Sequence, residues 1–305
     1  MGNPLTAGAV KLYVGHDAGN LQARRFNLTG PRMFNCTYGP LSRFLPDEVP
    51  LIEGWCDSGA FQDPPDRRRS HEQVLADQLA WESRASDRWG APYRHRALVS
   101  YDLLIDEKWN AGKRKKQRWS VSDADAAVTA TIAGAAFLSS RRAALAPRRL
   151  VLAAQGVDKI QYVECATSVL AHCTPDDIFG LGGWCILGRQ RSWLPTFWAS
   201  MRATLPLVAA AGLTRVHIFG VMFPAALGGL VWLADRHRLV VSTDSGKAAE
   251  DCTWLSPENA KRAGRRRDTW EENTSWWRHE LANLRTSPHY REPPQGRKDR
   301  QLQLC

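Results

Sequence analysis

The sequence has no run of 18 or more apolar residues, which is the length that a membrane-spanning helix requires. Its opening, MGNPLTAGAVKLYVG, has neither the basic start nor the continuous apolar stretch of a signal peptide. The seven cysteines are odd in number and show no paired spacing, which argues against a disulfide framework. These absences predict a cytoplasmic protein in a reducing compartment that has no membrane partner.

Motifs for metals and nucleotide cofactors are also missing. The stretch GKRKKQR, residues 112–118, lacks the glycine spacing of a phosphate-binding loop, and GLGG, residues 180–183, lacks that of a dinucleotide fingerprint. Cys165, His172 and Cys173 do not follow a spacing typical of zinc ligands. We therefore expect neither a cofactor nor a metal site.

Positive charge, in contrast, is present in excess. The formal net charge is +10, and basic residues cluster at 67–69, 113–118 and 265–267. Such clustering favours a polyanionic partner, although a solvated surface is the simpler alternative. The residues predicted to contact nucleic acid are Lys113, Arg114, Lys115, Lys116, Arg265, Arg266 and Arg267. Some of the 13 tryptophans, such as Trp276 and Trp277, either stack on bases or pack in the core.

Short apolar runs alternate with helix-like segments along most of the chain. We predict strands at 10–15, 50–57, 97–104, 149–156, 177–183, 215–221 and 238–244. Helices are predicted at about 70–89, 122–146, 158–172, 192–211 and 224–236, the first with Ser70 and Gln73 as a capping box. This repetition implies a parallel sheet, arranged either as a (β/α)8 barrel or as a doubly wound sheet.

A closed barrel needs one more strand than these seven. The region 28–45, rich in proline, glycine and aromatic residues, is where we expect the eighth. The predicted fold class is α/β, a TIM-like (β/α)8 barrel over residues 1–250. Residues 251–286 form a basic, tryptophan-bearing helical extension, and residues 287–305 form a poorly ordered basic tail.

Polar residues stand at the ends of the predicted strands. Asp57, Asp102, Gln155 and Asp244 each close a strand or lie near its end, and GLGG closes another. Because a parallel barrel carries its active site at the carboxyl ends of its strands, we expect these positions to converge on one pocket. The alternative is that each acid caps the helix that follows it.

Carboxylates, an amide and glycines in one pocket suit a nucleobase. A carboxylate accepts hydrogen bonds from the N1–H and the exocyclic amine of guanine, while an amide or a backbone N–H donates to its carbonyl oxygen. Two further carboxylates suit substitution at a glycosidic carbon, one as nucleophile and one as acid or base. The pattern therefore indicates chemistry on a nucleoside.

Four stretches carry a family resemblance. DSGAFQ, residues 57–62, is similar to the DSGGFQ motif of the tRNA-guanine transglycosylase superfamily. LAAQG at 152–156, GLGGW at 180–184 and VVSTDSG at 240–246 resemble its glutamine-glycine strand end, its guanine-binding loop and its nucleophile strand. The order and spacing match over roughly residues 10–250.

The resemblance implies a role for each matching residue. Asp244 would be the nucleophile that attacks C1′ of the target nucleoside, and Asp57 the general acid/base for the departing or incoming base. Asp102 and Gln155 would read the base edge. The residues implied in binding the base are Ser58, Phe61, Asp102, Gln155, Gly182 and Gly183.

One departure from the family restricts the resemblance to one of its branches. The tRNA enzymes build a zinc site from Cys-x-Cys-x-x-Cys and a later histidine beyond the nucleophile, whereas only Cys252 and Cys305 follow Asp244 here. A barrel without the zinc subdomain resembles instead the DNA 7-deazaguanine transglycosylases of bacterial modification clusters and phages. That branch implies DNA and a free 7-deazaguanine such as preQ0 as substrates, a bacterial cytoplasm, and a helper ATPase or helicase as a candidate partner. A tRNA enzyme without its zinc module and a noncatalytic nucleic-acid-binding barrel remain the alternatives.

Overall fold

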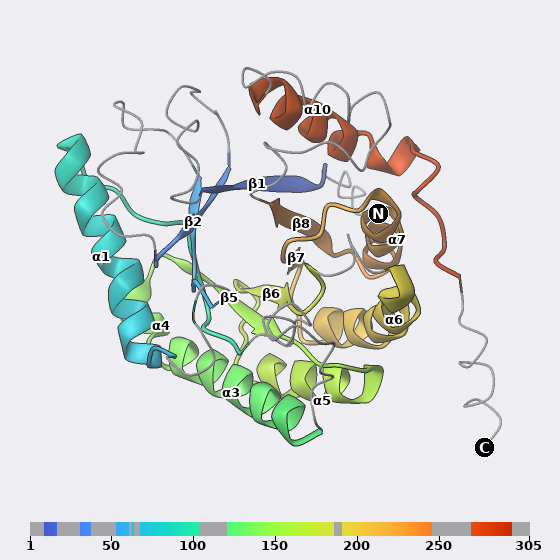
Figure 1. Cartoon of the computed structure of the whole chain (residues 1–305), viewed down its shortest axis with the longest axis horizontal. Helices are drawn as coiled ribbons and strands as arrows, with labels where there is room; N and C mark the ends of the chain where they lie inside the picture. The colour runs from blue at the N-terminus through green and yellow to red at the C-terminus, as the bar shows by residue number, and fades with distance from the viewer. Residues whose placement is uncertain are drawn as a thin grey trace, which may run out of the picture.

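Eight parallel strands form a closed barrel in which each strand pairs with the next and β8 pairs with β1 (Figure 1). The structure is a computed structural model that describes residues 9–16, 31–37, 53–60, 63, 68–103, 121–185, 191–245 and 270–294. The strands are β1 (Lys11–His16), β2 (Arg32–Asn35), β3 (Gly54–Asp57), β4 (Ala97–Val99), β5 (Arg149–Ala154), β6 (Ile178–Leu181), β7 (Arg215–Ile218) and β8 (Val240–Ser245). The predicted (β/α)8 barrel is confirmed.

The eighth strand is β2, which lies inside the region where it was expected. It pairs with β1 on one side and with β3 on the other, and Asn35 stands in register with Asp57. All four of its residues are buried. Its short length explains why the sequence pattern alone did not reveal it, since four residues carry little periodicity.

Helices cover the outside of the barrel, as Figure 1 shows. They are α1 (His71–Trp89), α3 (Val121–Ser140), α4 (Arg142–Leu145), α5 (Lys159–Leu170), α6 (Leu194–Ala210), α7 (Pro224–Asp235) and α10 (Trp270–Ala282), with 3-10 turns η4 (Arg191–Trp193) and η5 (Leu284–Thr286). The capping box predicted at the start of α1 is present, with Ser70 and Gln73 exchanging hydrogen bonds. The helix predicted at 122–146 is divided at Arg141 into α3 and α4. Within the described part of the chain, no helix has the length and apolar character needed to cross a bilayer.

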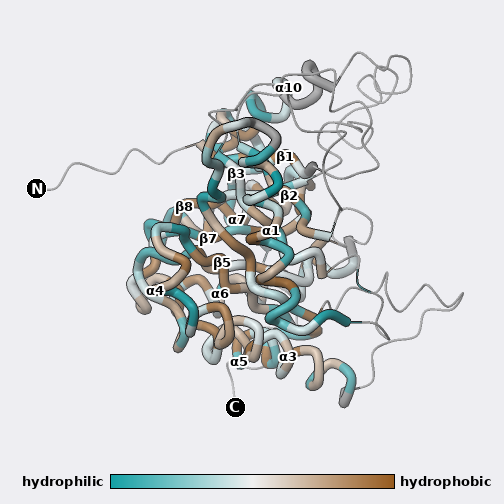
Figure 2. The backbone as a smooth tube through the Cα atoms, turned by 90° about the vertical axis from the view of Figure 1, so that its left-hand side faces the viewer, coloured by the Kyte–Doolittle hydropathy of each residue, from teal (hydrophilic) through white to brown (hydrophobic). Residues whose placement is uncertain are grey.

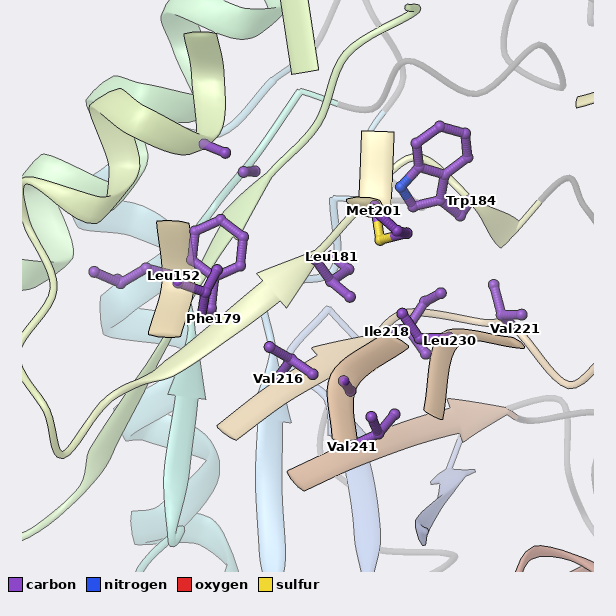
Figure 3. Packing of buried hydrophobic residues seen from close by; sticks show 14 of the residues in the cluster. Leu152, Phe179, Leu181, Trp184, Met201, Val216, Ile218, Val221, Leu230 and Val241 are labelled. Carbon is purple, nitrogen blue, oxygen red and sulfur yellow. The ribbon is translucent and has the colours of Figure 1, made fainter. Parts of the chain in front are cut away.

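Two apolar layers hold the barrel together. Outward-facing strand residues such as Val216 and Ile218 pack in the outer core against the helices, and Figure 3 shows Ile218 beside Leu230 of α7. Figure 2 shows hydrophobic stretches around β5 and β7, in the middle of the molecule. Strands buried on both faces read as continuous apolar runs, as β5 does.

The inside of the barrel is filled by a second set of side chains. Its buried members are Tyr13, Met33, Trp55, Ala97, Val99, Val151 and Ile178, with Phe219 packed against them. The ring centroids of Tyr13 and Trp55 lie 3.9 Å apart. This layer closes the barrel beneath the carboxyl ends of the strands, so a ligand has access to the site only from that end.

Helix α10 belongs to the helical layer of the barrel. It packs on β1, as Figure 1 shows, and its residues Trp277 and Leu281 are buried in the outer core. The helix after β8 covers the seam between the last and first strands in barrels of this kind. Helix α10, the described part of the predicted extension 251–286, therefore packs on the barrel, and Trp277 is a core residue.

The structure describes the chain beyond α10 as far as Pro294, whereas the sequence predicted poor order from Ser287 onward. Tyr290 donates a hydrogen bond to Asp235 at the end of α7, and Arg285 pairs with the same carboxylate. Arg202 of α6 donates to the carbonyl of Pro293, which is itself buried. For residues 287–294 the prediction was wrong, because two hydrogen bonds, one from Tyr290 and one to the carbonyl of Pro293, hold a segment whose composition is typical of a solvated tail. Residues 295–305 lie outside the described ranges.

Candidate active site

Three carboxylates meet at the carboxyl end of the barrel. Asp57 ends β3, Asp102 follows β4 by three residues, and Asp244 lies near the end of β8. The charges of Asp244 and Asp102 both act on Asp57 and raise its pKa. The strand ends thus bring together acids that are as much as 187 positions apart in the chain, counting from 57 to 244.

Within this acid cluster, Asp57 has the most strongly shifted pKa. Its pKa is raised to about 7, mainly by burial and then by the charges of Asp244 and Asp102. The backbone N–H of Gly59 donates to its Oδ2 over 3.3 Å and opposes this rise. A carboxyl group that titrates near neutral pH can both give and take a proton under physiological conditions.

Glycine at position 59 is required by the turn that follows Asp57. Gly59 has a φ of +71°, and a Cβ there would lie 2.3 Å from Cγ2 of Thr37 and 2.8 Å from Oδ1 of Asn35. The turn therefore runs directly against the end of β2. This close approach holds the backbone beside Asp57 against a neighbouring strand.

Asp102 and Gln155 contact each other above β4 and β5. Nε2 of Gln155 lies 3.2 Å from Oδ2 of Asp102, 2.6 Å from the carbonyl of Leu103 and 2.8 Å from Oγ1 of Thr131. Burial raises the pKa of Asp102 to about 6, and the nearby Arg68 opposes the rise. Because the two hydrogens on Nε2 already face three acceptors in the protein, Gln155 positions Asp102 and its amide N–H groups are not left to donate to a base carbonyl.

Gly182 and Gly183 lie beside this pair. A Cβ on Gly182 would be 3.8 Å from Oδ2 of Asp102, and a Cβ on Gly183 would be 3.5 Å from Cβ of Gln155. The N–H of Gly182 donates to the carbonyl of Ala154, so it continues the sheet. The φ of Gly183 is +79°, and its N–H has no hydrogen-bond acceptor among the residues that the structure describes. The two glycines keep the space over Asp102 clear of side chains, and Gly183 is the one with a backbone donor to offer.

Ser58 helps to build the turn that follows Asp57. Its side chain is 2% exposed, and its hydroxyl accepts a long hydrogen bond from the N–H of Ala60. Its carbonyl accepts hydrogen bonds from Nη2 of Arg69, at 2.7 Å, and from the thiol of Cys36. These contacts hold the turn in place, and the expected role of Ser58 in shaping the pocket stays a prediction.

Two arginines of the basic cluster 67–69 form ion pairs or hydrogen bonds with other residues of the protein. Arg69 pairs with Asp63 and Asp77 and holds the Ser58 carbonyl, and Arg68 donates to the carbonyl of Asp102. Both arginines therefore support backbone segments next to the acids. Charge clustering suggested surface contacts with a polyanion, whereas these two guanidinium groups have partners within the fold.

Asp244 is held by two groups that the sequence analysis did not single out. Its Oδ1 lies 3.1 Å from Nε2 of His217 on β7 and accepts a hydrogen bond of 3.0 Å from the N–H of Gly220. His217 is fully buried and faces the barrel interior, where its ring lies 5.0 Å from that of Trp55. The signal was present in the sequence, because a histidine flanked by Val216 and Ile218 in a barrel strand must face the other side from those two core residues.

Ser242, His217 and Asp244 form a chain of contacts, but not a hydrolytic triad. Nδ1 of His217 lies 3.0 Å from Oγ of Ser242, which stands two residues before Asp244 on the same strand. The hydroxyl is therefore one layer deeper in the barrel, and the acid is nearest the open end. A serine nucleophile requires the reverse order.

Several predicted site residues lie outside the described ranges. They are Phe61, Lys113, Arg114, Lys115, Lys116, Arg265, Arg266 and Arg267. Of the tryptophans considered for base stacking, Trp277 is buried and Trp276 packs against the outer core.

The fold and the site together define a (β/α)8-barrel protein with an acid cluster at the carboxyl ends of its strands. No group of three or more His, Cys, Asp and Glu side chains within the described ranges is placed to hold a metal ion. Comparison with known proteins returned no matching family model and no matching curated protein.

Proposed function

We propose that this protein is a DNA-guanine transglycosylase that exchanges guanine in DNA for a 7-deazaguanine base of the preQ0 type. The observation that carries the proposal is the pairing of Asp57, whose pKa is raised to about 7, with Asp244 at the end of one parallel barrel. Substitution at a glycosidic carbon with retention needs one carboxylate as nucleophile and one carboxyl group as acid and then base. The family resemblance of the four strand-end motifs supports the same roles.

The first half of the reaction releases guanine. An oxygen of ionised Asp244 attacks C1′ of the target nucleotide and forms a covalent C1′–O bond. The C1′–N9 bond breaks, and its electron pair leaves with the base. Asp57 gives its proton to the departing guanine and becomes a carboxylate, which a group with a pKa of about 7 can do near neutral pH.

The second half installs the new base. The incoming 7-deazaguanine loses the proton of its attacking nitrogen to the Asp57 carboxylate. That nitrogen forms a bond to C1′ and displaces Asp244, which leaves as a carboxylate. Asp57 is protonated again, so one base has replaced the other without any redox change or net uptake of protons.

Recognition of guanine in this proposal depends on Asp102 and Gly183. Asp102, with a pKa of about 6, is mainly ionised at neutral pH and accepts hydrogen bonds from N1–H and the exocyclic amine. The N–H of Gly183 donates to the carbonyl oxygen of the base. Gln155 contributes by holding Asp102 through its Nε2.

DNA is favoured over tRNA because this sequence departs from the zinc motif of the tRNA enzymes, with only Cys252 and Cys305 after Asp244. The net charge of +10 suits either polyanion. A base within a duplex must be extruded into the site, at a cost of a few kcal/mol. A tRNA enzyme without the zinc module is the second candidate, and a noncatalytic nucleic-acid-binding barrel is the third.

Incorporation of labelled preQ0 into duplex DNA and, in parallel, into unmodified tRNA tests the proposal. We expect label in DNA with the wild-type protein and at least a 10³-fold slower rate, roughly, with Asp244→Asn. Nucleic-acid binding should survive this substitution, which separates an enzyme from a binding barrel. Label in tRNA alone would favour the second candidate. If label enters neither, with binding intact and unchanged in Asp244→Asn, the protein is a binding barrel.

A further inference from the structure

His217 is a titratable side chain that the proposed exchange reaction does not use directly. It is 0% exposed and faces the barrel interior, with ring centroids of Trp55 and Phe219 at 5.0 and 4.7 Å. A buried imidazole without hydrogen bonds would be unfavourable, and here both ring nitrogens have partners. Those partners, Ser242 and Asp244, both belong to β8.

The hydrogen-bond chemistry assigns the proton on Nε2. Asp244 must be ionised to act as a nucleophile, and an ionised carboxylate only accepts hydrogen bonds. The 3.1 Å contact between Nε2 and Oδ1 therefore requires an N–H on Nε2. The Ser242 hydroxyl can donate or accept, so it fits Nδ1 in either state.

The two oxygens of Asp244 are not equivalent. Oδ1 accepts from Nε2 of His217 and from the N–H of Gly220, at 3.1 and 3.0 Å. Oδ2 has no hydrogen-bond partner among the residues in the described ranges. Both donors to Oδ1 come from β7 and the residues just after it, so they fix the rotation of the carboxylate from one side.

We infer that His217 is a positioning residue which holds Oδ1 of Asp244 and leaves Oδ2 as the oxygen that attacks C1′. This inference rests on the proposed function. A carboxylate that rotates freely would present either oxygen at a range of angles, whereas a near-attack geometry needs one fixed oxygen. His217 lies one layer below the site and would not contact the substrate.

Kinetics of two variants at position 217 test the role in the reaction. His217→Phe keeps a ring in the barrel but removes the donor, and we expect kcat to fall by about 10- to 100-fold with little change in KM for either substrate. His217→Gln places an amide N–H near the position of Nε2 and should recover part of the loss. Trp55→Phe, which alters packing against the same imidazole without touching its hydrogen bonds, is the matched control and should have a much smaller effect on kcat.

A measurement on the unreacted protein tests the hydrogen bond independently of activity. In ¹⁵N-histidine-labelled protein, we expect Nε2 of His217 to carry a proton and its signal to shift in Asp244→Ala. The signal is assigned by its absence in His217→Phe or, if that variant does not fold, in His217→Gln. A wild-type Nε2 without a proton, or a kcat unchanged in a folded His217→Phe, would overturn the inference. If wild-type protein exchanges no base in DNA or tRNA, the proposed function fails and the catalytic role of His217 falls with it, even where NMR detects the hydrogen bond.

Discussion

Nε2 of Gln155 lies 3.2 Å from Oδ2 of Asp102, and this contact joins the ends of β5 and β4 at the mouth of the barrel. The same nitrogen lies 2.8 Å from Oγ1 of Thr131, so α3 supports the pair from outside. Gln155 is 0% exposed and Asp102 is 7% exposed. A buried carboxylate in this position depends on its donor for its orientation, whereas its ionisation is favoured by the nearby Arg68.

In the proposed exchange reaction, Gln155→Leu should weaken binding of the base. The substitution removes the donor to Asp102 and leaves the Leu103 carbonyl and Thr131 with one partner fewer. We expect KM for the free 7-deazaguanine to rise by about 10-fold or more, and KM for DNA to change less. Gln161→Leu is the control, because it removes an exposed hydrogen bond to Asp125 and one from the N–H of Val157 without touching Asp102. An unchanged KM for the base would show that Gln155 does not position Asp102.

The proposed release of guanine should have a bell-shaped pH profile. Asp102 must be ionised to accept from the base, so the rate should rise with pH through about 6. Asp57 must be protonated to give its proton to guanine, so the rate should fall as pH rises through about 7. Single-turnover release of labelled guanine from DNA, measured between pH 5 and 9, checks this. Asp102→Asn should lose the acidic limb and move the alkaline limb to lower pH, because the charge of Asp102 contributes to the raised pKa of Asp57. A rate still rising above pH 8 in the wild-type protein would contradict the role of Asp57.

Asp57→Asn should stabilise the fold at high pH. The pKa of Asp57 is about 7 in the folded protein and 3.8 in the unfolded reference, so folding favours the protonated form. The stabilising contribution of this group is complete below about pH 4 and is lost as pH rises to about 7. Asparagine cannot ionise, and we expect the free energy of unfolding to rise by about 1–2 kcal/mol at pH 8 and not at pH 4. Urea unfolding at both pH values measures this, and an equal gain at the two would point to a cause other than ionisation.

Gly59→Ala should cost more stability than Gly90→Ala. Both glycines have positive φ, +71° and +62°, so both substitutions introduce backbone strain. A Cβ on Gly90 meets no atom within 4 Å, whereas one on Gly59 would clash with Thr37 and Asn35. We expect a cost of about 1 kcal/mol at position 90 and about 2–4 kcal/mol at position 59, the latter with loss of activity. An equal loss of unfolding free energy in the two variants, measured with urea, would mean that the end of β2 moves aside at no energetic cost.

The basic segment at 113–116 should contribute to the salt dependence of DNA binding. Replacing Lys113, Arg114, Lys115 and Lys116 by glutamine should reduce the slope of log K against log salt by about 0.9 for each phosphate that the variant no longer neutralises. A charge-matched control replaces four exposed arginines near the amino ends of strands, at the end of the barrel away from the acid cluster: Arg94, Arg96, Arg149 and Arg238. A slope reduced equally by both variants would show a general charge effect, and an unchanged slope would remove the segment from the DNA-binding surface.

The barrel architecture could be predicted from the sequence because its strands and helices follow from local residue patterns. Two-residue alternation and continuous apolar runs indicate strands, and Ser70 with Gln73 indicates the start of a helix. Parallel strands joined by helices have few arrangements, and all of them gather the strand ends at one edge. The meeting of Asp57, Asp102 and Asp244 follows from that rule alone, without knowledge of any side-chain conformation.

Tertiary structure decided which polar groups contact one another. The sequence did not indicate that Gln155 would use its amide N–H groups on Asp102, that Arg69 would turn inward to the Ser58 carbonyl, or that His217 would hold Asp244. Each of these contacts joins segments between 11 and 53 residues apart. Local periodicity determines which face of a strand a residue occupies, whereas its partner and its proton affinity depend on the burial and charge that only the assembled barrel provides.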